Sequence, residues 1–178
     1  MPISSAFLYS RVLNSFLSLT GILISLYSVF IEVKKGLDKN YVAFCDIDDL
    51  FACSKVFSSK FGKGFGLVAP YLGEDHVLNQ PNAVYGTLLY AALLVLSQVK
   101  RNWAAKLQLG LVILANCATP YLAYLLYKVI KAVCVLCVAI YIVNALLLGV
   151  ALWRVSALGP VGKRRRNGYR KKSSKKDQ

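Results

Sequence analysis

Four apolar segments, each about twenty residues long, dominate the hydrophobic pattern of this chain. They cover residues 12–33, 83–99, 107–127 and 132–153. An α-helix rises about 1.5 Å per residue, so each segment can cross a hydrocarbon layer roughly 30 Å thick. Because lipid offers the backbone no hydrogen-bond partners, each segment is expected to be helical. The pattern therefore predicts an all-α integral membrane protein, a bundle of four transmembrane helices.

The longest polar stretch, residues 34–82, separates the first two apolar segments. Near its centre, apolar and aromatic side chains alternate with glycines in the stretch FSSKFGKGFGLV, residues 57–68. This composition is typical of a short amphipathic segment with a glycine-rich bend that rests on a membrane surface. We expect it to form a lid over one end of the bundle.

Composition supports a membrane domain followed by a basic tail. Hydrophobic residues make up 57% of the chain, the mean hydropathy is +0.52, and the formal net charge is +14. Ten of the 22 basic residues lie from Arg154 to Lys176, so we divide the chain into a membrane domain, residues 1–153, and a tail, residues 154–178. No folded or aromatic-interleaved binding motif accompanies the basic run 163–166, so we expect contact with membrane lipid and no binding of nucleic acid.

The distribution of lysine and arginine predicts the orientation. Arg11 precedes the first segment, the tail follows the fourth, and the second and third segments are separated by Lys100, Arg101 and Lys106. By the positive-inside rule these parts face the cytosol, which places both termini there and the loop of residues 34–82 on the opposite side. Six lysines in that loop are balanced by six acidic residues, as an exported loop permits.

The end of the tail resembles a targeting signal. Lys175 and Lys176 lie four and three positions from the last residue, which resembles a dilysine retrieval signal of endoplasmic reticulum membrane proteins. Such a signal requires a cytosolic tail, which agrees with the charge pattern. We therefore predict a multi-pass protein of the endoplasmic reticulum membrane.

Two cysteine pairs are the candidate residues for thiol–disulfide chemistry. Cys134 and Cys137 form a C-x-x-C pair at the start of the fourth segment, and Cys45 and Cys53 lie in the exported loop, so all four thiols are expected on one membrane face. A helix N-terminus favours the thiolate, and an oxidising compartment allows disulfides to persist and exchange. Spacing alone leaves open which sulfur of the C-x-x-C pair attacks a substrate. The fifth cysteine, Cys117, is expected to be an ordinary buried thiol.

Other uses of four cysteines fit less well. A zinc site is disfavoured because the C-x-x-C pair lies in an apolar run, and because the loop pair is widely spaced for a zinc knuckle. Purely structural disulfides gain little from closing so short a loop. Nucleotide- and phosphate-binding motifs are absent from the sequence, so electrons are expected to enter through thiols. Two rival functions stay open: a quinone-linked disulfide-generating membrane protein, and a non-enzymatic four-helix scaffold with structural disulfides.

Several motifs in order carry a family resemblance. The stretch CDIDDLFACSKVFSSKFGKGFGLV is followed by LNQPNAVYG, YLAYLLY and CVLCVAIY. Together they resemble the vitamin K epoxide reductase family, over residues 25–141. The resemblance implies a membrane enzyme that reduces vitamin K epoxide to the quinone and the quinone to the hydroquinone. It also implies sensitivity to coumarin-type inhibitors, with vitamin K as substrate and without a tightly bound cofactor or a metal.

The resemblance assigns roles to the cysteines. Cys134 and Cys137 match the active-site pair, and Cys45 and Cys53 match the pair that receives electrons from a lumenal thioredoxin-like oxidoreductase. In this scheme Cys53 attacks Cys134, which leaves Cys137 facing the substrate.

The resemblance also assigns substrate contacts. Asn82 and Tyr141 match residues that bind the two carbonyl oxygens of the quinone, and apolar pocket positions are matched by Phe57, Leu122 and Leu126. The residues themselves agree for Tyr141, which lies four positions after the second cysteine of the C-x-x-C pair and so shares a helix face with it. Taken alone, Tyr141 also suits an interfacial aromatic belt and Asn82 an ordinary turn.

The chain departs from the family at two positions. Phe61 stands where the family usually has tryptophan, and Leu89 stands where a familiar member has phenylalanine. Both departures affect the expected shape of the pocket and its affinity for inhibitors.

Overall fold

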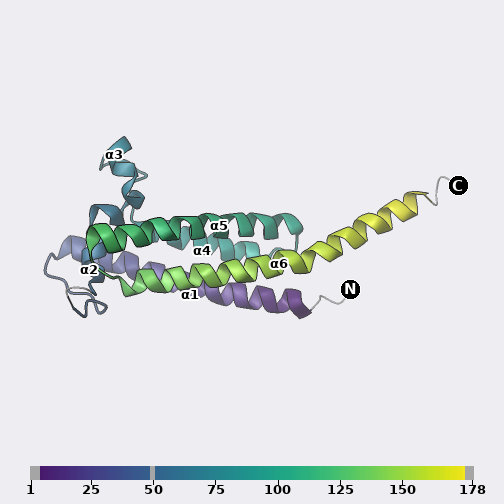
Figure 1. The fold of residues 1–178 in the computed structure, drawn as a ribbon, viewed down its shortest axis with the longest axis horizontal. Helices are drawn as coiled ribbons and strands as arrows, with labels where there is room; N and C mark the ends of the chain where they lie inside the picture. The colour runs from purple at the N-terminus through teal and green to yellow at the C-terminus, as the bar shows by residue number, and fades with distance from the viewer. Residues whose placement is uncertain (1–4, 49–50, 175–178) are drawn as a thin grey trace.

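The computed structural model describes residues 5–48 and 51–174 of the chain (Figure 1). The described residues form helices and turns without a β-sheet. The helices are α1 (Ser5–Leu37), α2 (Cys53–Phe57), η1 (Lys60–Gly62), η2 (Gly64–Gly66), α3 (Val68–Leu72), α4 (Asn82–Gln98), α5 (Asn102–Tyr124), η3 (Leu125–Ile130) and α6 (Val135–Ser174). The prediction of an all-α protein is confirmed.

Each of the four predicted apolar segments lies within a helix or overlaps one. Three stretches are long and apolar enough to cross a membrane: Phe7–Leu37, Asn102–Ile130 and Val135–Ser156. The fourth helix, α4, is shorter, with 17 residues. At 1.5 Å per residue it is roughly 25 Å long, slightly less than the usual hydrocarbon thickness.

The long helices lie side by side in one bundle (Figure 1). Helix α1 packs against α4 and α6, and α5 packs against α6. The bundle core is apolar, with Leu17, Tyr90, Leu93, Val112 and Leu147 among its buried side chains. Many other apolar side chains are exposed on the outer surface, as expected for helices that face lipid.

Gly21 allows α1 to approach α4 closely. A Cβ atom added to Gly21 would lie 2.7 Å from the ring of Tyr90, well inside contact distance. Tyr90 is almost fully buried, with its ring against the backbone of α1 at Gly21. Small residues at helix interfaces commonly permit such close packing in membranes.

The chain between α5 and α6 leads into the cysteine pair. Helix α5 ends in the π-helical turn η3, and Lys131 then takes a left-handed backbone conformation with φ of 52°. The next residues are extended, and Val133 accepts a hydrogen bond of 3.2 Å from the amide of Ala52 in the polar loop. Helix α6 therefore starts at Val135, three residues later than predicted, and it continues through most of the basic tail to Ser174. Lys175 and Lys176 lie outside the described residues.

The expected lid segment consists of the short turns η1 and η2 and the five-residue helix α3. Three successive residues have left-handed backbone conformations: Gly64, Phe65 and Gly66. Glycine adopts this conformation easily, whereas a residue with a side chain does so rarely. Helix α3 projects away from the bundle, and its Tyr71 is 85% exposed (Figure 1).

Candidate active site

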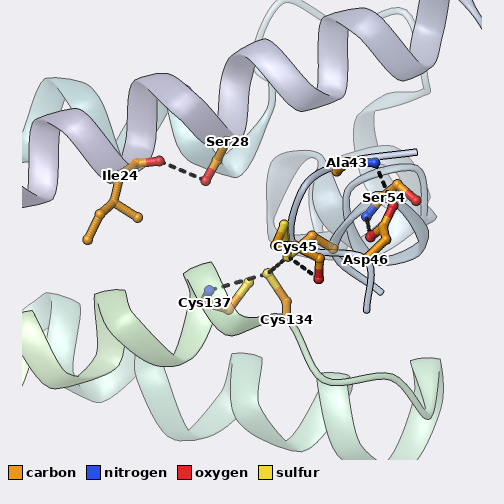
Figure 2. Close-up of a disulfide and its surroundings, with 9 residues drawn as sticks. Ile24, Ser28, Ala43, Cys45, Asp46, Ser54, Cys134 and Cys137 are labelled. Atoms are coloured by element: carbon orange, nitrogen blue, oxygen red, sulfur yellow. Dashed lines mark hydrogen bonds between the residues drawn. A yellow bond between two sulfur atoms is a disulfide. The ribbon is translucent and has the colours of Figure 1, made fainter. Parts of the chain in front are cut away.

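The structure brings the two cysteine pairs together at one end of the bundle. Cys45 and Cys53 form a disulfide, whereas Cys134 and Cys137 are free thiols. The Sγ atom of Cys134 lies 3.7 Å from the Sγ atom of Cys53. Both of these cysteines are fully buried. Figure 2 shows Cys134 beside the disulfide of Cys45. Two sulfurs in near contact are placed for thiol–disulfide exchange, in which a thiolate attacks one sulfur of a disulfide.

Asp46 stabilises the segment that carries the loop disulfide by accepting two backbone hydrogen bonds (Figure 2). Its carboxylate accepts hydrogen bonds of 2.9 Å from the amides of Ala43 and Ser54, which flank the two loop cysteines. Burial alone would raise the pKa of Asp46, but the hydrogen bonds from Ser54 and Ala43 outweigh it and hold the pKa below its usual value. The carboxylate therefore stays ionised at neutral pH and keeps both bonds.

Cys134 occupies the N-terminus of α6. Its carbonyl accepts the first helical bond, from the amide of Val138, and its Sγ accepts the amide of Cys137 at 3.3 Å (Figure 2). The sulfur thus takes the place of an N-cap oxygen. Free amides and the helix dipole at this position favour a negative charge, so the local structure supports a thiolate.

Beside the cysteines is a cavity of about 320 Å³ between the helices and the lid segment. Small-molecule sites usually begin near this size. Cys137 lies on its wall and Cys134 does not, because the latter points toward the loop disulfide. All of the substrate-contact residues predicted from the sequence line the cavity: Phe57, Asn82, Leu122, Leu126 and Tyr141. The two departures from the family pattern, Phe61 and Leu89, also lie on this wall.

Asn82 connects the base of α4 to the lid segment. Its Oδ1 accepts a hydrogen bond from the amide of Phe65 at 2.7 Å, and its Nδ2 donates to the carbonyl of Phe61 at 2.8 Å. The first bond holds Phe65 in its left-handed conformation, and the hydroxyl of Tyr121 donates to the Phe65 carbonyl at 3.3 Å. One hydrogen of the Asn82 amide is left for a further acceptor, because an amide nitrogen carries two.

A polar group in the cavity was not predicted from the sequence. The hydroxyl of Tyr90 donates to Oδ1 of Asn144 at 2.8 Å, and Nδ2 of Asn144 lies 3.5 Å from the hydroxyl of Thr119. The three side chains are on the cavity wall. Asn144 lies seven residues after Cys137, so the helical repeat on this face of α6 could have indicated it. Asp46, which directly follows a loop cysteine, could likewise have been singled out.

The expectation for Cys117 was wrong. Its side chain is exposed on α5 and does not belong to the bundle core. The position still lies within an apolar span, so the thiol faces the surface where lipid would lie.

Comparison with known proteins identifies the family. The model of the vitamin K epoxide reductase family matches residues 12–152, which is most of the chain. The chain belongs to the vitamin K epoxide reductase family. Two similar proteins are named vitamin K epoxide reductase complex subunit 1. The one from Mus musculus is 37% identical over 139 residues, and the one from Rattus norvegicus is 34% identical over 139 residues. Both matches cover 78% of this chain and 86% of the relative.

Membership in the vitamin K epoxide reductase family, together with the apolar helices, makes the chain a multi-pass membrane oxidoreductase. The family thus accounts for a free C-x-x-C pair beside a cavity and a second pair within reach of it. A non-enzymatic scaffold does not need a free thiol in near contact with a disulfide.

Proposed function

We propose that this chain reduces vitamin K 2,3-epoxide to the quinone, and the quinone to the hydroquinone, with Cys134 and Cys137 as the reducing dithiol. One observation carries the proposal. Cys134 touches Cys53 of the loop disulfide, while Cys137, three residues along, reaches the cavity. The C-x-x-C pair therefore links an electron entry point to a place where a quinone can bind.

Electrons enter through the loop pair. A lumenal thioredoxin-like dithiol reduces the bond between Cys45 and Cys53 and is itself oxidised. The thiolate of Cys53 then attacks Cys134 in the oxidised C-x-x-C pair, which forms a mixed disulfide and releases Cys137 as a thiolate. Attack of Cys45 on Cys53 restores the loop disulfide and releases Cys134. The observed arrangement, with an oxidised loop and free C-x-x-C thiols, corresponds to the end of this transfer.

The substrate step uses the second sulfur. The thiolate of Cys137 forms a bond to a ring carbon, and for the epoxide the carbon–oxygen bond breaks and the oxygen takes a proton. Attack by Cys134 on the Cys137 sulfur then forms the disulfide and returns the electron pair of the carbon–sulfur bond to the ring. The epoxide oxygen leaves as water, which yields the quinone. When the quinone itself is the substrate, it gains two electrons and two protons and becomes the hydroquinone.

Two polar side chains orient the ring in this proposal. The hydroxyl of Tyr141 lies on the same helix face as Cys137 and can donate to one oxygen. Asn82 can donate its remaining amide hydrogen to the other while it holds the lid segment. Phe57, Leu122 and Leu126 surround the apolar parts of the ring and its tail. Coumarin-type inhibitors are expected to compete for the same cavity.

The proposed enzyme sits in the endoplasmic reticulum membrane with four spans and both termini in the cytosol. In this arrangement α4 is the second span despite its length, and η1, η2 and α3 form a lid on the lumenal surface. Residues 1–153 then form the catalytic membrane domain, with its lumenal loop at 34–82. The basic tail, residues 154–178, begins at Arg154 inside the cytosolic end of the bundle. Vitamin K binds as a substrate, and electrons come from the partner without a tightly bound cofactor.

The first test is dithiol-dependent reduction of vitamin K epoxide and of the quinone by the purified full-length protein in detergent. Cys134→Ala and Cys137→Ala are expected to abolish both reactions. Cys45→Ala should retain activity with a small dithiol, which can reach the C-x-x-C pair directly, and lose it with a thioredoxin-like protein as reductant. Cys117→Ala is the matched control, because it removes an exposed thiol on α5 that is not part of either cysteine pair.

Two results would overturn the proposal. A folded wild-type protein that reduces neither substrate would exclude it. Loss of activity with a small dithiol in Cys45→Ala would show that the loop pair does more than deliver electrons. If the protein oxidises a dithiol partner with a quinone much faster than it reduces the epoxide, the rival role as a disulfide generator is favoured.

A further inference from the structure

Two arginines lie together at the end of α4, where Arg11 contacts Gln98 and Arg154 contacts Val99. Figure 1 shows that the turn between α4 and α5 and the N-terminus lie at the end of the bundle opposite α2, the short helix that begins at Cys53. Arg154 of α6 is fully buried, and Arg11 of α1 is half-buried. Their guanidinium carbons lie 5.8 and 5.9 Å from the ring centre of Phe7. Two positive groups therefore share one aromatic ring.

The contacts of Arg154 hold it in place without neutralising it. It donates to the carbonyl oxygens of Leu96 at 3.0 Å and Val99 at 2.7 Å, at the end of α4. It also donates to the side-chain oxygen of Gln108 on α5. All three acceptors are uncharged, so the positive charge is not compensated.

Among the described residues, this end of the bundle has no acidic side chain. Aspartate and glutamate are absent before Glu32 and from residue 76 to residue 176. Glu32 lies toward the opposite end of α1, beyond the cavity-lining Ser25 and Ser28. Burial of a charge is costly unless an opposite charge accompanies it. A counter-charge for the arginines would therefore have to come from outside the described chain.

Unpaired polar atoms indicate the same kind of partner. Four buried nitrogen donors at this end have no hydrogen-bond partner among the described residues: Nε of Arg11, Nδ2 of Asn14, Nε2 of Gln108 and Nε of Arg154. Unpaired buried acceptors within the described residues belong to Glu32 and Asn79, which lie elsewhere. Buried polar groups are normally paired. A cluster that contains unpaired donors and no unpaired acceptor indicates a missing partner that accepts hydrogen bonds and carries negative charge.

We propose that these residues form an anion site for a phosphate group, and that the phosphate belongs to a phospholipid headgroup. We call Arg11, Asn14, Gln108 and Arg154 the arginine site. Arg11 is the contact residue, because it is only half-buried and its bond of 2.7 Å to the side-chain oxygen of Gln98 is exposed. Arg154 lies behind it and provides a positive field.

The position of the site favours a lipid over a free ion. Arg11 lies four residues after the start of the apolar stretch Phe7–Leu37, and Arg154 lies two residues before the end of the stretch Val135–Ser156. The ends of membrane helices are where lipid phosphates are within reach. The exposed Lys100 and Arg101 follow the end of α4 and add to the attraction for an anionic headgroup. A guanidinium suits phosphate because it offers two parallel donors.

The test is a thermal-unfolding titration of the delipidated full-length protein in detergent. One series adds a short-chain phosphatidylglycerol, and a second adds inorganic phosphate. Phosphatidylglycerol is expected to raise the unfolding midpoint, and Arg11→Gln should require about tenfold more lipid for the same rise, as expected for loss of a charge-assisted hydrogen bond. Lys106→Gln is the matched control, because it removes one exposed charge from the same end of the bundle.

The outcomes separate the possible sources. Stabilisation by phosphatidylglycerol alone, dependent on Arg11, supports the lipid site. An equal rise with inorganic phosphate and the same dependence on Arg11 would support the anion chemistry but overturn the lipid as its source. The site would be overturned if Arg11→Gln and Lys106→Gln reduced the stabilisation by lipid equally. It would also be overturned if neither anion raised the unfolding midpoint of the wild-type protein. If Arg11→Gln does not fold, Arg11→Lys replaces it, because lysine keeps the charge and loses the paired donors.

Discussion

Asp46 offers the sharpest test of how the loop disulfide is held against Cys134. Asp46→Asn removes the charge and leaves one acceptor oxygen for two amide donors, those of Ala43 and Ser54. A hydrogen bond to a charged group contributes about 1.5–3 kcal/mol. Asp46 is partly exposed, so the lower value applies. About 1.5 kcal/mol corresponds to roughly a tenfold shift of the loop toward an open state.

Disulfide trapping measures this shift directly. In a protein with Cys45→Ser, Cys137→Ser and Cys117→Ala, oxidation by diamide can join Cys53 to Cys134 only while the loop is closed. We expect Asp46→Asn to slow this cross-link by up to about tenfold. Asp75→Asn is the control, because it removes a charge from an exposed position in the loop before α4.

The pH dependence of the cross-link has a definite sign. The pKa of Asp46 is lower in the folded protein than in the unfolded chain, so its contribution is complete above the unfolded value. It is lost as the pH falls through the lower, folded value. Loop closure should therefore be insensitive to Asp46 titration near neutral pH and should weaken only in acid. Cross-linking at the wild-type rate in Asp46→Asn would refute the reasoning.

Three further changes test the packing and the cavity. Gly21→Ala places a methyl group against the ring of Tyr90, so it should destabilise the bundle by about 1–3 kcal/mol, measured by thermal unfolding beside Gly110→Ala, where a Cβ meets nothing within 4 Å. Tyr141→Phe removes a proton donor and should lower the rate of quinone reduction by about 100-fold or more while the Cys53–Cys134 cross-link is unchanged; an unaltered rate would exclude Tyr141 as the donor. Asn82→Ala frees the backbone of Phe61 and Phe65, so proteolysis of the segment 60–72 should accelerate, whereas equal cleavage in wild type and variant would show that Asn82 does not hold the lid segment.

The sequence was sufficient to locate the helices because lipid imposes one simple condition. A spanning segment must be apolar and must satisfy its own backbone, so length and hydropathy predict the helix. The start of α6 was less accessible, because it depends on the bond between Ala52 and Val133, which pairs residues far apart in the chain. The short turns of the lid segment depend in the same way on Asn82.

Burial within the bundle was the hardest property to predict. A membrane helix is apolar toward its neighbours and toward lipid, so hydropathy does not show which face is inside. Cys117 was misplaced for this reason. Polar residues were more informative, since Asn144 and Arg154 are both buried and both hydrogen-bonded within the bundle. The motifs located the cysteines, but their near contact required the tertiary structure.

The short main-chain bridge between Ala52 and Val133 bears on how freely this enzyme can change over evolution. The bridge joins the loop to the start of α6 through backbone atoms, so it does not depend on which side chains stand at Phe51 or Val133. We therefore expect the bridge to tolerate other side chains at those two positions. Proline at position 52 is the change that would remove the amide donor of Ala52. The 3.7 Å separation between the sulfurs of Cys53 and Cys134 thus depends on main-chain geometry. A designer who transfers this arrangement of cysteines to another bundle would have to copy the main-chain bridge itself, because copying the neighbouring side chains would not reproduce it.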